Sequence, residues 1–183
     1  MRGFLKIRTA LGNQLLKKKK KQTPRNRAVY NFDNAKSVGI LFDANHSDAF
    51  DSIIAFYKFL KKRGIKSQML GYVEDKELPD QMVLRDNCEF VSLRDIDLWL
   101  RPKNEAGVNF MKETFDILFD LSLEDYFTMH YISTLSVAKF KVGRYKDTPN
   151  DYDFMINIDK KPSVEYLIEQ IEVYVEILNK TST

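Results

Sequence analysis

Two apolar segments separated by an amphipathic one constrain the fold of this 183-residue chain most strongly. Residues 36–43 form an almost continuous apolar run ending in Asp43, a pattern typical of a strand buried on both faces of a parallel sheet. Residues 50–60 carry apolar side chains at helical spacing, and Gly64 is placed to end that helix. Residues 66–73 form a second apolar segment. This order predicts a βαβ unit, whose crossover is right-handed in almost all proteins.

The rest of the chain continues the alternation of strands and helices. Asn45 is expected to cap the first helix of the body, and Ser122 begins a capping-box-like signal for a later one. The fold class is therefore α/β: a three-layer Rossmann-like sandwich with a mainly parallel sheet, preceded by a basic amphipathic helix. Further strands are expected at 90–91, 115–121, 137–142 and 154–158, and further helices at 122–134 and 162–178.

Charge is distributed unevenly along the chain. The first 30 residues hold ten Lys/Arg and no Asp/Glu, whereas the other 153 hold 19 Lys/Arg and 26 Asp/Glu. The net charge of +3 therefore divides into +10 on an N-terminal arm and −7 on a body. Such asymmetry indicates a segment that binds something anionic. The candidate residues for an anionic partner are Lys17, Lys18, Lys19, Lys20, Lys21, Arg25 and Arg27.

The arm has the pattern of an amphipathic helix. Apolar residues recur at spacings of three and four, and Pro24 ends the pattern because proline disfavours helical geometry before it. We expect a helical arm at 1–22, a linker at 23–35 and a Rossmann-like domain at 36–183. The predicted apolar stripe consists of Phe4, Ile7, Leu11 and Leu15.

Three hypotheses explain this arm. A basic amphipathic helix can lie on an acidic membrane surface. The lysines can instead bind phosphates of a nucleic acid or a ribosome. Because no aromatic residue lies among them to stack on bases, such binding would not read a base sequence. The apolar stripe can also pack on the acidic body or on a second copy in a homodimer.

The sequence also indicates in which cellular compartment the protein is expected. The single Cys88 cannot form an internal disulfide, no apolar run approaches the length of a membrane span, and the N-terminus makes a poor signal peptide. We expect a cytoplasmic protein, or one peripheral to a membrane.

A candidate ligand site lies where two predicted strands end. If the strand order is Rossmann-like, Asp43 and Asp120 lie side by side at the carboxyl edge of the sheet, where open α/β sheets bind ligands. Two helix starts at this edge suit a phosphate, so a nucleotide or a sugar phosphate is the alternative to a docking function. The candidate ligand-binding residues are Asp43, Asn45, His46, Ser47, Asp120 and Ser122.

Several classes of enzyme are not indicated. The chain has no GxGxxG, GxxxxGK[ST], GxSxG or HExxH motif, and two His with one Cys make a zinc site improbable. We therefore expect no metal or cofactor, and a non-catalytic docking or accessory protein is the first hypothesis.

Two segments resemble the N-terminal domain of heptosyltransferase-type (GT-B) glycosyltransferases. Residues 115–121 are similar to that family's strand with Asp at its second position and Asp-Leu at its end. Residues 138–144, beginning Ala-Lys and containing Gly143, are similar to the strand that follows the next helix. The resemblance covers about thirty residues. It implies a Rossmann-like half-fold, as in a small uncharacterised bacterial family.

The same resemblance implies little about activity. The family has a Gly-Asp pair after its first strand, and residues 45–51 contain only Asp48 as a loose counterpart, without glycine. Its second Rossmann domain, which binds the sugar nucleotide, has no counterpart in these 183 residues. The resemblance therefore carries over a fold and no reaction.

Overall fold

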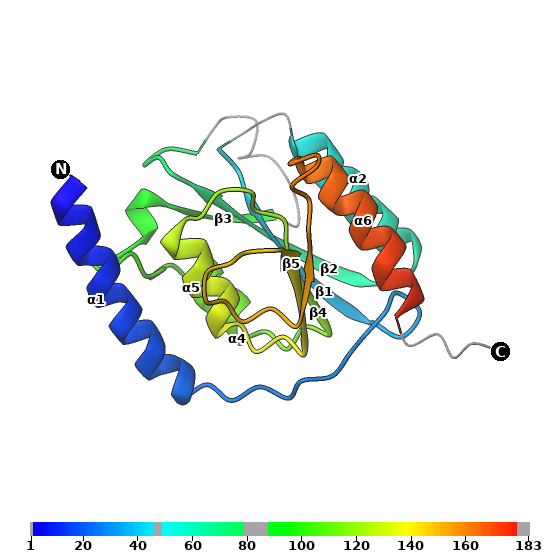
Figure 1. Cartoon of the computed structure of the whole chain (residues 1–183), viewed down its shortest axis with the longest axis horizontal. Coiled ribbons are helices and arrows are strands. Elements are labelled where there is room, and N and C mark those ends of the chain that lie inside the picture. The colour runs from blue at the N-terminus through cyan, green and yellow to red at the C-terminus, as the bar shows by residue number, and fades with distance from the viewer. Residues whose placement is uncertain (1, 46–48, 79–87, 179–183) are drawn as a thin grey trace.

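The computed structural model of the chain describes residues 2–45, 49–78 and 88–178, with side chains from residue 7 onward. Its centre is a six-stranded sheet in which every neighbouring pair of strands is parallel, in the order β3-β2-β1-β4-β5-β6 (Figure 1). This is the Rossmann order, and it confirms the predicted fold class. The strands are β1 (Ser37–Asp43), β2 (Lys66–Val73), β3 (Cys88–Ser92), β4 (Ile117–Asp120), β5 (Phe140–Arg144) and β6 (Phe154–Ile156).

Helices cover both faces of the sheet and complete three layers. Helices α2 and α6 pack together over one face, and α4 and α5 over the other, with α1 lying outside α5 (Figure 1). None of the described helices is long and apolar enough to cross a membrane. The helices are α1 (Arg2–Lys21), α2 (Phe50–Lys62), α4 (Glu105–Lys112), α5 (Phe127–Leu135) and α6 (Val164–Ile177), with a 3₁₀ turn η2 at Leu93–Asp95.

Both predicted helix caps in the body are wrong. Helix α2 begins after Ala49, and α5 begins after Tyr126, neither with a side-chain cap. Asn45 instead donates to Asp43 and accepts from a backbone amide, while the Ser122 hydroxyl donates to Asp120. The carboxylates at the strand ends lie only two residues away, so they take up these polar side chains before the helices begin.

Helix α4 was not predicted, because Gly107 interrupts its pattern. In the structure Asn104 caps the helix, accepting a hydrogen bond from the amide of Gly107 at 3.2 Å. A Cβ at Gly107 would lie 2.8 Å from Pro102 and 3.0 Å from Val91. The glycine therefore permits close packing of α4 against β3 and does not end the helix.

Helix α1 is present, but the predicted apolar stripe is not its packed face. Ile7 and Leu11 remain 59% and 37% exposed, whereas Gly12 and Leu16 are buried against the body. A Cβ at Gly12 would lie 2.7 Å from the Phe127 ring. The helix thus turns its glycine face inward because only a residue without a side chain allows this close approach.

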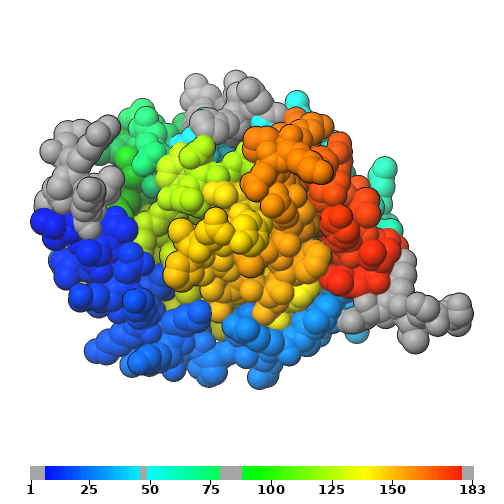
Figure 2. Space-filling view, viewed as in Figure 1, coloured from blue at the N-terminus to red at the C-terminus, as the bar shows by residue number. Residues whose placement is uncertain are grey.

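Residues 23–35, expected to be a linker, form an ordered strap along the body. Figure 2 shows the strap, in blue to light blue, along the lower edge of the molecule. Phe32 is only 3% exposed and packs edge-on against Phe56. The backbone amide of Ala28 donates to the backbone carbonyl of Lys139 at 3.1 Å, and the Asn31 side chain donates to the carbonyl of Leu178 at 2.7 Å. The strap therefore contributes Phe32 and Ala35 to the core of the domain.

We predict that Phe32→Ala lowers the free energy of unfolding by about 3–5 kcal/mol, the usual cost of removing a buried aromatic ring. Urea denaturation measures the change. Val29→Ala in the same strap is the control, since Val29 is 46% exposed and its truncation should cost less than about 1 kcal/mol. Equal effects of the two variants would show that the strap is a loosely attached linker.

Candidate functional site

The two strand-end aspartates lie at the same edge of the sheet, as expected. Strands β1 and β4 are neighbours, with Leu41 opposite Asp120. Asp43 closes β1 two residues further on and is largely buried. Of the other residues predicted for this site, Asn45 and Ser122 follow these strands, whereas His46 and Ser47 lie outside the described residues.

Asp120 is fully occupied by contacts within the protein. Its side chain is 2% exposed. One carboxylate oxygen accepts hydrogen bonds from the amide of Ser122, at 3.0 Å, and from the Ser122 hydroxyl, while the other accepts from the Tyr152 hydroxyl at 2.5 Å. Burial and the charge of Asp120 raise the pKa of Tyr152 well above its usual value. Asp120 therefore fastens the chain before β6 to the end of β4.

Asp43 organises the turn that follows β1. Its Oδ1 accepts hydrogen bonds from the backbone amide and the side-chain amide of Asn45, at 2.9 and 2.5 Å. Asn45 in turn accepts from the amide of Glu74 at 2.6 Å, which ties this turn to the end of β2. The neighbouring cavity of about 240 Å³ is lined by Asp43, Ala49, Leu123, Pro162, Ser163, Val164 and Glu165.

The charged residues that line the cavity beside Asp43 are acidic. The lining of the cavity beside Asp43 includes Asp43 and Glu165 and no Lys or Arg among its described residues. Burial, followed by the charges of Asp43 and Glu74, raises the pKa of Tyr126 to about 12. Within the described part of the chain, no group of three or more His, Cys, Asp and Glu is arranged to hold a metal ion. These surroundings disfavour a bare phosphate, and a ligand at this edge stays a prediction.

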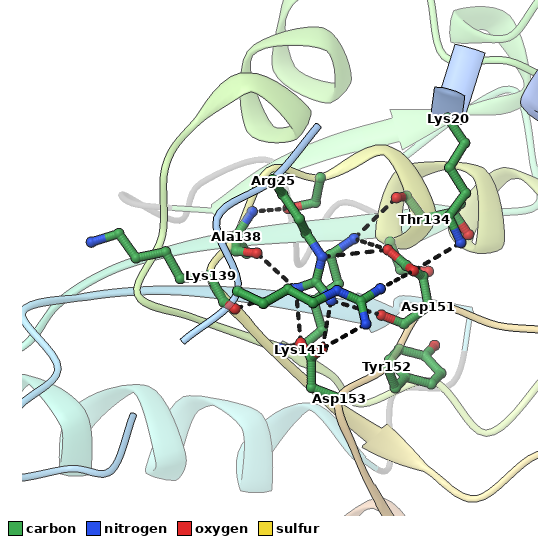
Figure 3. Close-up of polar contacts among 12 residues, drawn as sticks. Lys20, Arg25, Thr134, Ala138, Lys139, Lys141, Asp151, Tyr152 and Asp153 are labelled. Atoms are coloured by element: carbon green, nitrogen blue, oxygen red, sulfur yellow. Dashed lines mark hydrogen bonds and ion pairs between the residues drawn. The ribbon is translucent and has the colours of Figure 1, made fainter. Parts of the chain in front are cut away.

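A second polar cluster, absent from the sequence-based prediction, fastens the arm and the strap to the body. Its centre is Asp151, a largely buried carboxylate in the segment between β5 and β6 (Figure 3). Asp151 forms ion pairs with Lys20 at 2.8 Å, Arg27 at 2.9 Å and Lys141 at 3.0 Å. We call the cluster of Lys20, Arg25, Arg27, Lys141, Asp151 and Asp153 the arm clamp.

Arg25 contributes the geometry of the clamp. Its guanidinium donates to both carboxylate oxygens of Asp153, at 2.8 and 2.6 Å, and to the carbonyl of Ala138 at 2.9 Å. Such a two-pronged contact fixes orientation as well as distance. Because the Arg25 side chain is almost completely buried, the strap is held to the start of β5 in one position.

Lys141 completes the clamp from inside the protein. It is fully buried, and its ammonium group donates to Asp151 and to the carbonyl of Thr134 near the end of α5. Burial lowers the pKa of Lys141 to about 8, against the opposing charge of Asp151. Sequence alone gave no signal for this residue, since a lysine between Phe140 and Val142 is typical of a solvent-facing strand position.

The predicted anion-binding residues thus divide into two groups. Lys20, Arg25 and Arg27 are paired within the clamp, and Lys19 lies over the Tyr131 ring at 5.8 Å. The other members of the lysine run are exposed and form no ion pair within the described residues. This second group consists of Lys17, Lys18 and Lys21.

Comparison with known proteins assigns the chain to a family. Residues 8–178 match the model of a family of unknown function, DUF6913, and the chain belongs to this family. No curated protein matches the chain. The likeness to heptosyltransferase-type glycosyltransferases stays a prediction.

We predict that Asp151→Asn lowers the free energy of unfolding at pH 7 by about 3–5 kcal/mol, because it leaves the buried Lys141 without its counter-charge. The control is Glu77→Gln, which breaks an exposed ion pair with Arg94 and should cost less than about 1 kcal/mol. Urea denaturation of the variants and the wild type gives both values.

The contribution of Asp151 should also depend on pH. Burial would raise its pKa, but the charge of Lys141 and hydrogen bonds from Lys20 and Lys141 outweigh burial and hold the pKa below its usual value. The stabilisation is therefore complete above the unfolded-state pKa of about 3.9 and is lost as the pH falls through the lower folded-state pKa. The difference between wild type and Asp151→Asn should shrink below about pH 4. A difference that grows on acidification would contradict this assignment.

Proposed function

We propose that this member of DUF6913 is a non-catalytic docking protein that binds an acidic membrane surface, from the cytoplasmic side, through helix α1. One observation carries the proposal: the helix is fastened to the body by one face, while lysines and aliphatic side chains occupy the opposite face. The membrane contact would be peripheral.

The clamp explains why the helix can act as a preformed docking surface. Lys20 is held by Asp151, and Arg8 donates to the carbonyl of Leu98 at 2.7 Å near the other end of the helix. With both ends attached to the body, Lys18 and Lys21 are displayed without an ordering cost on binding. A lysine close to an anionic leaflet contributes about 1 kcal/mol.

Exposed aliphatic side chains favour lipid over a naked phosphate polymer. Ile7 and Leu11 share the outward face of α1 with Lys18, and Leu98, which is 68% exposed, belongs to the segment that Arg8 contacts. An interfacial helix places such groups at the boundary between headgroups and acyl chains. Phosphates of a nucleic acid would use the lysines alone.

The alternative, a nucleotide or sugar phosphate at the strand edge, has weaker support. Both carboxylates that motivate it accept hydrogen bonds within the protein, and the cavity beside Asp43 is lined by acidic and apolar groups. Docking through α1 is therefore the function that the geometry favours.

We predict that Lys18→Glu combined with Lys21→Glu weakens binding to vesicles containing phosphatidylserine by about 30-fold or more, as the loss of about 2 kcal/mol requires. Co-sedimentation at physiological salt measures the affinity. The matched control is Lys61→Glu combined with Lys62→Glu at the end of α2, which makes the same change in net charge on another exposed surface. The control should retain most of the binding.

A second pair of variants separates lipid from nucleic acid. Ile7→Ser with Leu11→Ser should weaken vesicle binding while leaving any retention on RNA unchanged, since only a bilayer contacts the aliphatic groups. Binding of the wild type to RNA but not to vesicles would overturn the membrane as partner. Equal losses in the α1 and α2 charge variants would overturn the docking role of α1.

A further inference from the structure

We infer that a cleft between α1 and α5 is a binding site for a small organic phosphate, independent of the docking surface. The cleft has a volume of about 590 Å³, within the range of sites that hold metabolites. We call it the α1–α5 cleft. Its lining includes Leu16, Lys17, Lys20, Phe127, His130 and Thr134.

Cationic side chains reach the cleft from opposite walls. Lys17 and Lys20 come from α1, and Lys146 comes from the segment that follows β5. Lys20 is paired with Asp151 and Lys146 with Asp125, whereas Lys17 has no ionic partner in the described part of the chain. The cleft therefore offers the positive charge of Lys17, in contrast to the cavity beside Asp43.

Two residues of α5 that line this cleft have side-chain polar groups without a hydrogen-bond partner among the described residues. Thr134 is 7% exposed, and its hydroxyl makes no hydrogen bond with any described residue. His130, one helical turn earlier, contacts the Phe127 ring, and its imidazole makes no hydrogen bond within the described residues. A buried hydroxyl without a partner costs about 1–3 kcal/mol, so a ligand that accepts its hydrogen bond would recover that cost.

The chemistry of the lining selects a phosphate ester. Burial lowers the pKa of His130, and the positive charges of Lys146 and Lys20 add to this effect against the negative charges of Asp120 and Asp125. A phosphate dianion presents enough acceptor oxygens for Lys17, His130 and Thr134 together. Apolar walls from Leu16 and Phe127 suit the organic part of the ligand.

The experiment uses the two histidines of the chain, His46 and His130, as reporters. The full-length protein with ¹³C-labelled histidine is titrated with adenosine 5′-monophosphate, ribose 5-phosphate and inorganic phosphate, and His130→Gln assigns the signals. We expect the His130 signal to shift saturably with at least one of the two esters. Inorganic phosphate should bind more weakly, because it leaves the apolar walls uncovered.

Matched variants locate the site. Lys17→Gln should weaken ester binding about tenfold or more, the usual effect of losing a charged hydrogen bond, whereas Lys18→Gln on the outward face should leave it unchanged. Thr134→Val should also weaken binding while leaving the free protein as stable as the wild type or more so. This second variant separates ligand contact from a folding defect.

Four outcomes would overturn the inference. They are the absence of a His130 shift with all three probes, a saturable shift of His46 alone, equal losses in Lys17→Gln and Lys18→Gln, and unchanged affinity in Thr134→Val. None of them bears on vesicle binding through Lys18 and Lys21, so this site and the proposed docking function fail separately.

Discussion

The ion pairs of the buried Asp151 carboxylate are the interactions on which the arrangement of α1 and the strap depends. One acidic side chain pairs with Lys20 of α1, Arg27 of the strap and Lys141 of β5, so it joins the N-terminal helix and strap to a part of the chain that is distant in sequence. An isolated buried charge is costly, and here the opposite charges of the carboxylates and the cations reduce that cost. The clamp therefore orients α1, and with it both the outward lysines and the α1–α5 cleft.

The two aspartates at the strand edge have a structural role in a place where related folds bind ligands. Asp43 and Asp120 occupy the place where open α/β sheets bind ligands, yet both accept hydrogen bonds from the turns that follow them. Asp120 also holds Tyr152, which connects β4 to the segment before β6. In this protein both carboxylates stabilise the turns that follow their strands.

Sequence patterns predicted the body well because strand and helix periodicities are local. The strand at 66–73 was predicted to the residue, and the helix expected at 162–178 is α6, at Val164–Ile177. Predictions failed where a distant neighbour decides the outcome. Asn45 and Ser122 form hydrogen bonds with carboxylates and do not cap helices. Gly107 permits close packing of a helix whose sequence pattern it interrupts. The strap is held to the body by the buried Phe32 and by the ion pair of Arg25.

The sequence by itself determined the α/β class, the adjacency of Asp43 and Asp120 once the Rossmann order is assumed, and the presence of a basic N-terminal helix. Only the tertiary structure decided which lysines are available and which are consumed within the protein. The reason is that a run of identical side chains on a helix points in all directions around its axis. Which of them meets a buried carboxylate depends on how closely Gly12 lets the helix approach α5, and that is a property of the packed molecule.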